Sequence, residues 1–174
     1  MADTTGGAGN RPTIHRLRVY GEPTPKGSMK CIGRRGKVAH KLVEDDTSGG
    51  RARWRDTLTA AARVLTTRIT EPLDEHVTIG ALFILPRPAA ARRRAFPNRR
   101  NTGDLDKLTR QLLDALTDAG VLNDDSRVVA LQVAKVYETQ DRRAGVTVYV
   151  ASEGNPHSPI LNALLTAAPE LQEL

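Results

Sequence analysis

Between residues 76 and 150 the chain switches between strand-like and helix-like hydrophobic patterns, and this alternation constrains its fold more than any other feature. Residues 76–85 form an almost continuous apolar run, which indicates a well-buried strand. Residues 105–119 instead carry leucines and alanines at helical spacing. Two β-branched segments follow on either side of a polar turn, at 128–136 and 146–150. The pattern therefore predicts a strand, a helix and two further strands.

The preceding part of the chain adds a strand, a hairpin and a helix. Residues 14–20 alternate in the manner of a first strand, and residues 28–40, interrupted by Gly33 and Gly36, predict a β-hairpin with a basic face. A helical pattern follows Gly50, with Trp54 and its apolar neighbours on one face. The resulting order predicts a single α+β domain: a mixed β-sheet with a β-hairpin and two main helices.

The length of 174 residues suits one such domain with tails. Residues 1–12 are Gly-rich and lack an apolar signal core, so we expect a disordered lead-in. The domain is predicted to cover residues 13–151. Residues 152–174 contain glutamates but no Lys or Arg, and form a predicted tail with a short helix over 160–168.

Composition narrows the class of protein. A net charge of +6 favours nucleic acid or another anionic surface as the partner. Aromatic residues make up 3% of the chain, too few for a reader of single strands that uses several stacking rings. One cysteine, Cys31, excludes an intrachain disulfide, and the four histidines show no zinc-ligand spacing. No apolar run is long enough to span a bilayer, so we expect a cytoplasmic protein without a membrane partner.

An acidic segment lies directly beside a basic one. Residues 101–125 contain six Asp against two cations, and residues 87–100 contain six Arg and no acid. Such a neighbourhood suggests that a cation and a polyanion bind together, because Mg²⁺ is held by carboxylates plus substrate phosphate. Nucleic acid is the commonest polyanion for a basic protein. The two segments therefore favour a metal-dependent nuclease.

Each acid also has a simpler structural interpretation. Asp104 is placed to be a helix N-cap, and Asp106 in the first turn favours the helix dipole. Asp106, Arg110 and Asp114 lie four apart and suit a salt-bridge ladder. If instead the strand after the helix pairs beside residues 83–85, Asp125 is expected to return to the end of the sheet where the helix starts. Three carboxylates from two segments then share one Mg²⁺.

The run from Asp104 to Val128 resembles the signature of the RusA family of Holliday-junction resolvases. It reads Asp-Leu-Asp-Lys-Leu, then Leu-Asp-Ala-Leu-Thr, Ala-Gly-Val and Asp-Asp, and the earlier Pro25-Lys26-Gly27 is also similar. The resemblance implies a small endodeoxyribonuclease of bacteria and their phages, acting in the host cytoplasm. It implies Mg²⁺, with Mn²⁺ as an alternative and no other small-molecule cofactor, and phosphodiester hydrolysis in four-way or related branched DNA. It also implies a homodimer, because two symmetric nicks need two active sites.

The resemblance assigns roles to individual residues. Asp104, Asp106 and Asp125 would bind the metal, with Asp124 a weaker candidate. The family commonly has Asn where this chain has Lys107, and a catalytic Lys where this chain has Arg110. An arginine retains the positive charge and can stabilise a developing negative charge, but it does not donate a proton near neutral pH. Lys107 places a further cation beside the metal site, where it weakens metal binding or contacts DNA.

Two basic segments are predicted to hold DNA by its phosphates. In the hairpin the candidates are Lys26, Lys30, Arg34, Arg35, Lys37 and Lys41, and in the following loop they are Arg87, Arg92, Arg93, Arg94, Arg99 and Arg100. The alternative for the second segment is a charged, disordered loop that does not contact DNA. A rival for the whole protein is a non-catalytic basic DNA-binding protein of phage replication or packaging, in which the carboxylates are caps and surface charges. Such a module gains nothing from six acids beside its DNA, which favours the nuclease.

Overall fold

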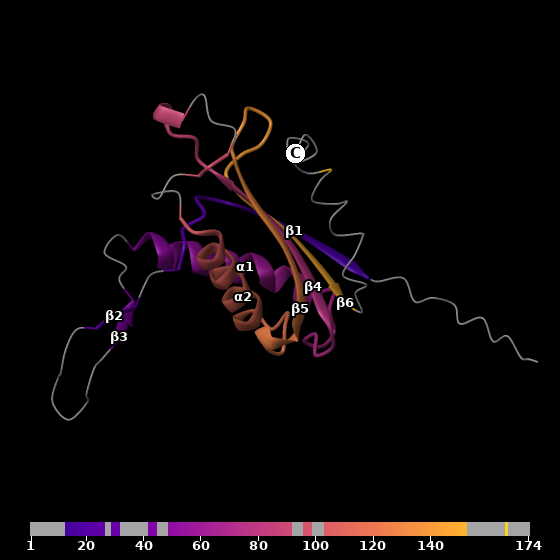
Figure 1. Ribbon diagram of the computed structural model, residues 1–174. Coiled ribbons are helices and arrows are strands. Elements are labelled where there is room, and N and C mark those ends of the chain that lie inside the picture. The colour runs from indigo at the N-terminus through magenta and orange to yellow at the C-terminus, as the bar shows by residue number, and fades with distance from the viewer. Residues whose placement is uncertain are drawn as a thin grey trace, which may run out of the picture.

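The structure of the chain is a computed structural model, which describes residues 13–26, 29–31, 42–44, 49–91, 96–98, 103–152 and 166. The elements are β1 (Ile14–Tyr20), β2 (Met29–Cys31), β3 (Leu42–Glu44), α1 (Gly50–Thr66), β4 (Val77–Leu85), the 3₁₀ turn η1 (Ala89–Ala91), α2 (Leu105–Asp118), the 3₁₀ turn η3 (Asp125–Arg127), β5 (Val128–Tyr137) and β6 (Gly145–Ser152) (Figure 1). The order and the single α+β class match the predictions.

Four strands form one mixed sheet in the order β1-β6-β4-β5. β4 and β5 run parallel and are joined through α2, whereas β6 is antiparallel to both β1 and β4. Strands β1, β4 and β5 therefore run in the same direction and finish at one end of the sheet, which we call the carboxyl end. Strand β6 begins at this end. A separate two-stranded ribbon, β2–β3, lies apart from this sheet (Figure 1).

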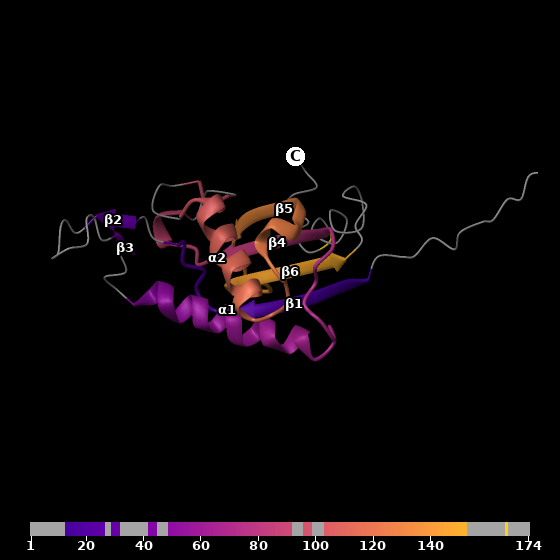
Figure 2. The same cartoon turned by 90° about the horizontal axis from the view of Figure 1, so that it is seen from below.

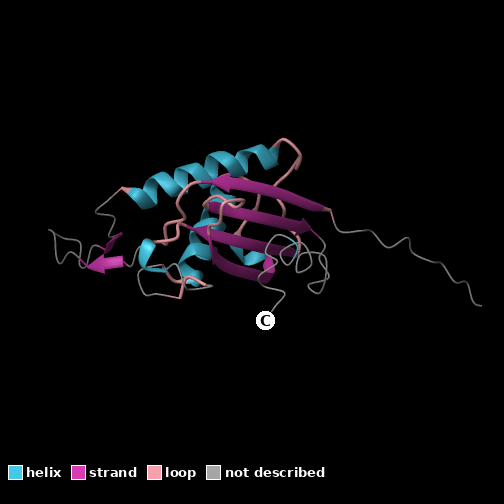
Figure 3. Cartoon of the chain, turned by 90° about the horizontal axis from the view of Figure 1, so that it is seen from above, coloured by secondary structure: helices cyan, strands magenta, loops and turns pink. Residues whose placement is uncertain are grey.

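Both helices cover the same face of the sheet (Figure 2). All nine residues of β4 are buried, and every second one, from Val77 to Leu85, packs with the apolar sides of α1 and α2. The predicted apolar face of α1 is confirmed, since Trp54, Leu58 and Leu65 are buried there. Helix α1 lies along the β1 side of the sheet (Figure 3). This packing places the amino end of α2 at the carboxyl end of the sheet.

The opposite face of the sheet carries a second, smaller apolar cluster. Leu82, Ile84, Val136, Tyr149 and Ala151 are buried together, with Phe96 packed against them. These residues alternate along their strands with those of the main core, as the pleat of a strand requires. The sheet is therefore apolar on both faces, which explains why β4 reads as a continuous apolar run.

One predicted pairing differs from the structure. The strand that pairs with Met29–Cys31 is Leu42–Glu44, whereas the hairpin was expected to close within residues 28–40. The glycines at 33 and 36 favoured an early turn, but the observed pairing encloses a longer connection. The lead-in at 1–12 and most of the tail lie outside the described residues. No helix in the described part of the chain is long and apolar enough to cross a membrane.

Candidate active site

The amino end of α2 presents two carboxylates. Asp104 occupies the N-cap position with an extended backbone (φ −81°, ψ 138°), yet its side chain makes no capping hydrogen bond. Its carboxylate is 65% exposed and lies 3.5 Å from the ammonium of Lys107. Asp106, in the first turn, is exposed and has no ion pair within the described residues. The predicted N-cap is thus confirmed in position but not in bonding, so its carboxylate stays open to a ligand.

Three contacts fix this helix start. Gly103 precedes it with φ +79°, and a Cβ at that position would lie 2.9 Å from the ring of Pro25. The carbonyl of Gly103 accepts a hydrogen bond of 2.7 Å from the Lys135 ammonium on β5. The backbone amide of Lys26 donates to the carbonyl of Lys107 at 3.3 Å. Residues from the loop after β1 and from β5 therefore converge on the first turn.

The salt-bridge ladder along α2, the structural alternative for these residues, is not formed among the described residues. Arg110 is exposed and, within the described part of the chain, forms no ion pair with Asp106 or Asp114. Asp114 pairs instead with Lys26, and both side chains are about three-quarters buried. The next turn repeats the arrangement, since Asp118 binds Arg55 at 2.6 Å. The later acids of α2 bind other segments, whereas Arg110 forms no ion pair with any residue that the structure describes.

Asp125 does not return to the amino end of α2, as the sequence had suggested. The predicted pairing of β5 with β4 is present, but in a parallel register that places Val128 beside Val77. Asp125 therefore lies at the opposite end of the sheet, in a hollow that is also lined by two cations and four other residues: Lys26, Arg55, Asp114, Thr117, Asp118 and Asp124. Helix α2 has 14 residues and spans about 20 Å, so it separates Asp125 from Asp104.

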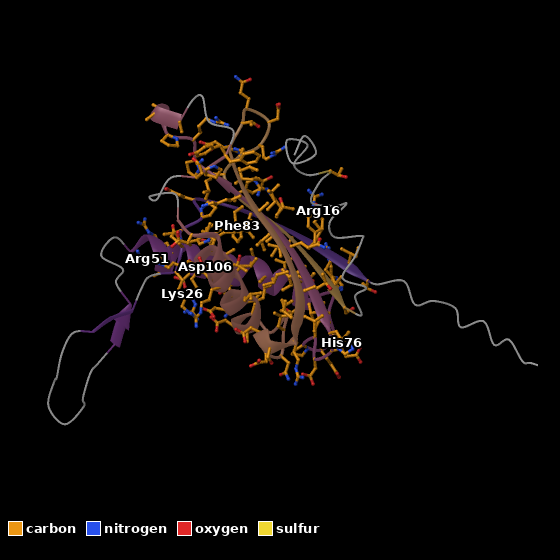
Figure 4. The ribbon with its side chains drawn as sticks, in the orientation of Figure 1. Arg16, Lys26, Arg51, His76, Phe83 and Asp106 are labelled. Atoms are coloured by element: carbon orange, nitrogen blue, oxygen red, sulfur yellow. The ribbon has the colours of Figure 1, made fainter. Side chains whose placement is uncertain are left out.

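Figure 4 shows labelled residues from the two ends of the sheet. Asp106 lies close to Lys26 in this view, whereas His76, the residue before β4, lies at the far end of the molecule. Among the described residues no three His, Cys, Asp or Glu side chains of one chain gather closely enough to hold a metal. Asp104 and Asp106 nevertheless fit Mg²⁺, which is commonly bound by one or two carboxylates together with substrate phosphates.

The neighbouring acids Asp124 and Asp125 differ in their bonding. The Asp124 carboxylate accepts a hydrogen bond of 2.9 Å from the backbone amide of Ser126 and caps η3. The side chain of Ser126, and then its backbone amide, lower the pKa of Asp124 by hydrogen bonding to the carboxylate, more than the charge of Arg127 does. Asp125 is exposed and has no such bond in the described part of the structure. Asp124 is therefore a structural residue, and Asp125 is the one open to a ligand.

The predicted DNA contacts are only partly visible. Lys26 is about three-quarters buried against Asp114, and Arg87 stacks on the Tyr137 ring at 4.8 Å while its amide donates to Glu138. Both residues therefore hold the fold together. Lys107 lies beside Asp104, as expected from the sequence. The side chains of the remaining candidates lie outside the described residues: Lys30, Arg34, Arg35, Lys37, Lys41, Arg92, Arg93, Arg94, Arg99 and Arg100.

Sequence reasoning missed a second basic group. Arg16 and Arg18 alternate with the buried Leu17 and Val19 of β1, and they lie with the arginines of the β5–β6 turn in one hollow. The available signal was this alternation, because two arginines at every second position of a strand occupy one face. The structure adds the turn residues, which are more than 120 positions away in sequence.

Comparison with protein families gives one match. The family model described as endodeoxyribonuclease RusA matches residues 21–149, which is well over half of the chain. The matched range contains the whole of α2 and both flanking strands of the sheet. No match was found among curated proteins.

Proposed function

The chain belongs to the RusA endodeoxyribonuclease family of Holliday-junction resolvases, and we propose that it cuts four-way DNA junctions as a Mg²⁺-dependent homodimer. Nucleases of this family are metal-dependent. The observation that carries the proposal is the pair of exposed carboxylates, Asp104 and Asp106, at the amino end of α2, neither of which binds another segment among the described residues. Under the competing hypothesis of a non-catalytic DNA-binding protein, these two carboxylates would have no role.

In this proposal Asp104 and Asp106 hold the ion. When bound, Mg²⁺, or Mn²⁺ in its place, neutralises charge on the scissile phosphate and lowers the pKa of an attacking water. The positive dipole end of α2 favours a phosphate at the same place. Lys107 partly neutralises Asp104 before DNA arrives. Arg110, one turn further along, stabilises negative charge that develops on the phosphate.

Asp125 enters the site from the partner subunit in our proposal. β5 is the last strand of the sheet, and its outer edge pairs with no other strand described here. It also exposes two large apolar side chains, Val129 at 60% and Leu131 at 47%. Long apolar edge strands are sites at which a second chain adds its own strand. The β5 edge therefore suits a twofold contact between two copies.

In such a contact the carboxylates of the two subunits would lie near each other. Two copies of β5 related by a twofold axis perpendicular to the sheet run antiparallel, so the start of one strand lies beside the end of the other. The end of β5 lies at the carboxyl end, where Lys135 binds Gly103 beside Asp104. The axis also keeps both helix layers on one face. Asp125 of the partner subunit then approaches Asp104 and Asp106.

Mixing inactive subunits tests this arrangement. Asp106→Asn and Asp125→Asn are each expected to abolish cleavage of a synthetic four-way junction in Mg²⁺. In a mixed dimer, however, one site combines the intact Asp104 and Asp106 of one subunit with the intact Asp125 of the other. Co-refolding the two variants should therefore restore nicking, to about a quarter of the wild-type site count if subunits pair at random.

The matched control mixes Asp104→Asn with Asp106→Asn. Both changes fall on the same half of the site, so no combination of these subunits restores an intact site and the mixture should stay inactive. If the Asp106→Asn and Asp125→Asn mixture also stays inactive while each variant still forms dimers, Asp125 does not act across the interface. A wild-type protein that leaves junctions uncut in Mg²⁺ and Mn²⁺ would refute the proposed function itself.

The basic segments outside the described residues keep their predicted role in this proposal. Replacing Arg92, Arg93 and Arg94 by Ala should flatten the dependence of log affinity on log salt by about 2 to 3 units. An unchanged slope would mean that this loop does not touch DNA.

A further inference from the structure

A basic hollow lies on the face of the sheet that the helices leave uncovered. It has a volume of about 250 Å³ and is lined by four arginines, one acid and three other residues: Arg16, Arg18, Tyr20, Ile84, Asp141, Arg142, Arg143 and Thr147. Four positive charges against one negative charge give it a net charge of +3. The residues come from β1, β4, β6 and the β5–β6 turn, so the tertiary fold brings them together.

The hollow faces away from the helices but lies at the same end of the sheet as Asp104. Arg18 pairs in register with Thr147, and Tyr20 with Gly145, where β6 begins. Arg16 contacts the ring of Tyr149, which belongs to the second apolar cluster. In Figure 4 Arg16 appears on the β1 side, across the sheet from Asp106. A substrate held at Asp104 therefore reaches the hollow by passing around one end of the sheet.

Arg18 lies at the centre of this group. One of its terminal nitrogens donates to the carbonyl of Arg143, and the other, Nη1, is buried and has no hydrogen-bond partner among the residues that the structure describes. Burial lowers the pKa of Arg18, and the nearby Tyr20 partly offsets this effect. A buried donor without an acceptor is costly, and clustered like charges repel each other. An anionic oxygen in the hollow would relieve both costs.

Tyr20 adds an aromatic surface to the charged group. Its side chain is 62% exposed, and it is the one strongly exposed aromatic residue in the described part of the chain. The Arg18 guanidinium lies 4.8 Å from the centre of its ring. An exposed ring beside arginines is the combination with which proteins hold a nucleotide, since the ring stacks on a base and the arginines bind the phosphate.

We propose that this hollow binds a phosphodiester group of the DNA substrate, with Tyr20 stacked on an adjacent base. Arginine suits the task because its planar fork binds phosphate through two hydrogen bonds. The site would hold a junction arm on the face opposite the helices. The inference rests on the proposed function for the identity of the ligand, but it concerns binding and not cleavage.

Binding of a fluorescent four-way junction in the presence of a chelator tests the hollow without cleavage. Arg142→Gln with Arg143→Gln is expected to weaken binding about tenfold and to reduce the salt slope by about 1 to 2 units. The control, Arg63→Gln with Arg68→Gln, removes the same charge from exposed positions in and just after α1 and should leave the slope unchanged. Arg142→Lys with Arg143→Lys should retain most of the slope.

Two further variants separate the proposal from a folding defect. Asp141→Asn removes the single acid of the hollow and should tighten binding severalfold, a gain that unfolding does not produce. Glu75→Gln, at the other end of the sheet, is its control and should have no effect. Tyr20→Leu should weaken binding about fivefold or more, whereas Tyr20→Phe should not, because the stacking ring is kept.

Equal salt slopes for the two arginine pairs, together with no gain in Asp141→Asn, would overturn the proposal and leave the hollow to another anionic partner. A wild-type protein that binds junctions in this way but does not cut them in Mg²⁺ would refute the proposed function alone. Normal cleavage with unchanged binding in all of these variants would refute the hollow alone.

Discussion

The two ends of α2 carry the same residue type in opposite circumstances. At the amino end, Asp104 does not cap the helix and Asp106 has no ion pair within the described residues. Toward the carboxyl end, Asp114 and Asp118 are bound to cations from other segments. The acids of the second half help to hold the fold together, whereas among the described residues Asp104 pairs only within its own helix, with Lys107. An aspartate that the fold does not use is available to a substrate or an ion.

The comparison between the two ends of α2 predicts that substitutions at the amino end have the largest effect on cleavage. Asp104→Asn and Asp106→Asn should each reduce junction cleavage by at least about a hundredfold, because each removes a ligand charge on which the reaction depends. Binding of the uncut junction should be kept or improved, since a negative charge near phosphate is lost. Gel assays of cleavage and binding measure both quantities.

Asp118→Asn is the matched control for these two variants. It changes the same residue type on the same helix, but at a carboxylate that binds Arg55. We expect cleavage within a few-fold of wild type and a slightly lower Tm, because exposed ion pairs contribute about 0–1 kcal/mol. Equal losses of cleavage in all three variants would remove the distinction between the two ends.

The next largest effect is expected at Arg110. Arg110→Ala should slow cleavage roughly a hundredfold, the scale for losing one charge-stabilising group, whereas Arg110→Lys should keep measurable activity. Since Arg110 has no ion pair with Asp106 or Asp114 in the described part of the chain, its removal should leave Tm nearly unchanged. Near-wild-type cleavage with a lowered Tm would instead show that Arg110 is a structural residue.

Most of the fold followed from the sequence because each element carries a local pattern. The continuous apolar run of β4 indicates a strand that is buried on both faces, and the apolar stripe of α2 indicates a helix with one buried face. The pairing partner of β2 did not follow, since its partner strand has only three residues and lies beyond a pair of misleading glycines. Short ribbons take their register from distant contacts, which a local pattern does not encode.

The site was predictable in composition but not in geometry. The acids and their spacing pointed to a metal-dependent nuclease, and the family match agrees. The error concerned Asp125, because a parallel crossover returns the chain to the opposite end of the sheet from the helix start. A strand that follows a helix in a βαβ unit begins at the end where the first strand began. Applying that rule to the sequence would have exposed the conflict.

A smaller effect is expected for the pair that joins Lys26 to Asp114. Lys26→Met and Asp114→Asn should each lower Tm by a few degrees, and the double variant should lose less than their sum because the two side chains interact. A double-mutant cycle by thermal denaturation should give a coupling of about 0.5–1 kcal/mol. Additive losses would mean that the pair contributes nothing beyond packing.

The smallest change in Tm is expected at Asp124, and it should distinguish this residue from Asp125. Asp124→Ala removes the acceptor for the Ser126 amide and should lower Tm slightly without affecting cleavage, whereas Asp125→Asn should abolish cleavage. The hydrogen bond from Ser126 lowers the folded-state pKa of Asp124, so its stabilisation is present above the unfolded value of about 3.9 and is lost as the pH falls through the folded value. The difference in Tm between wild type and Asp124→Ala should therefore persist at pH 7 and disappear in strong acid. A loss of cleavage in Asp124→Ala with an unchanged Tm would reverse the roles of the two carboxylates, and a difference that grew on acidification would contradict the assigned hydrogen bond.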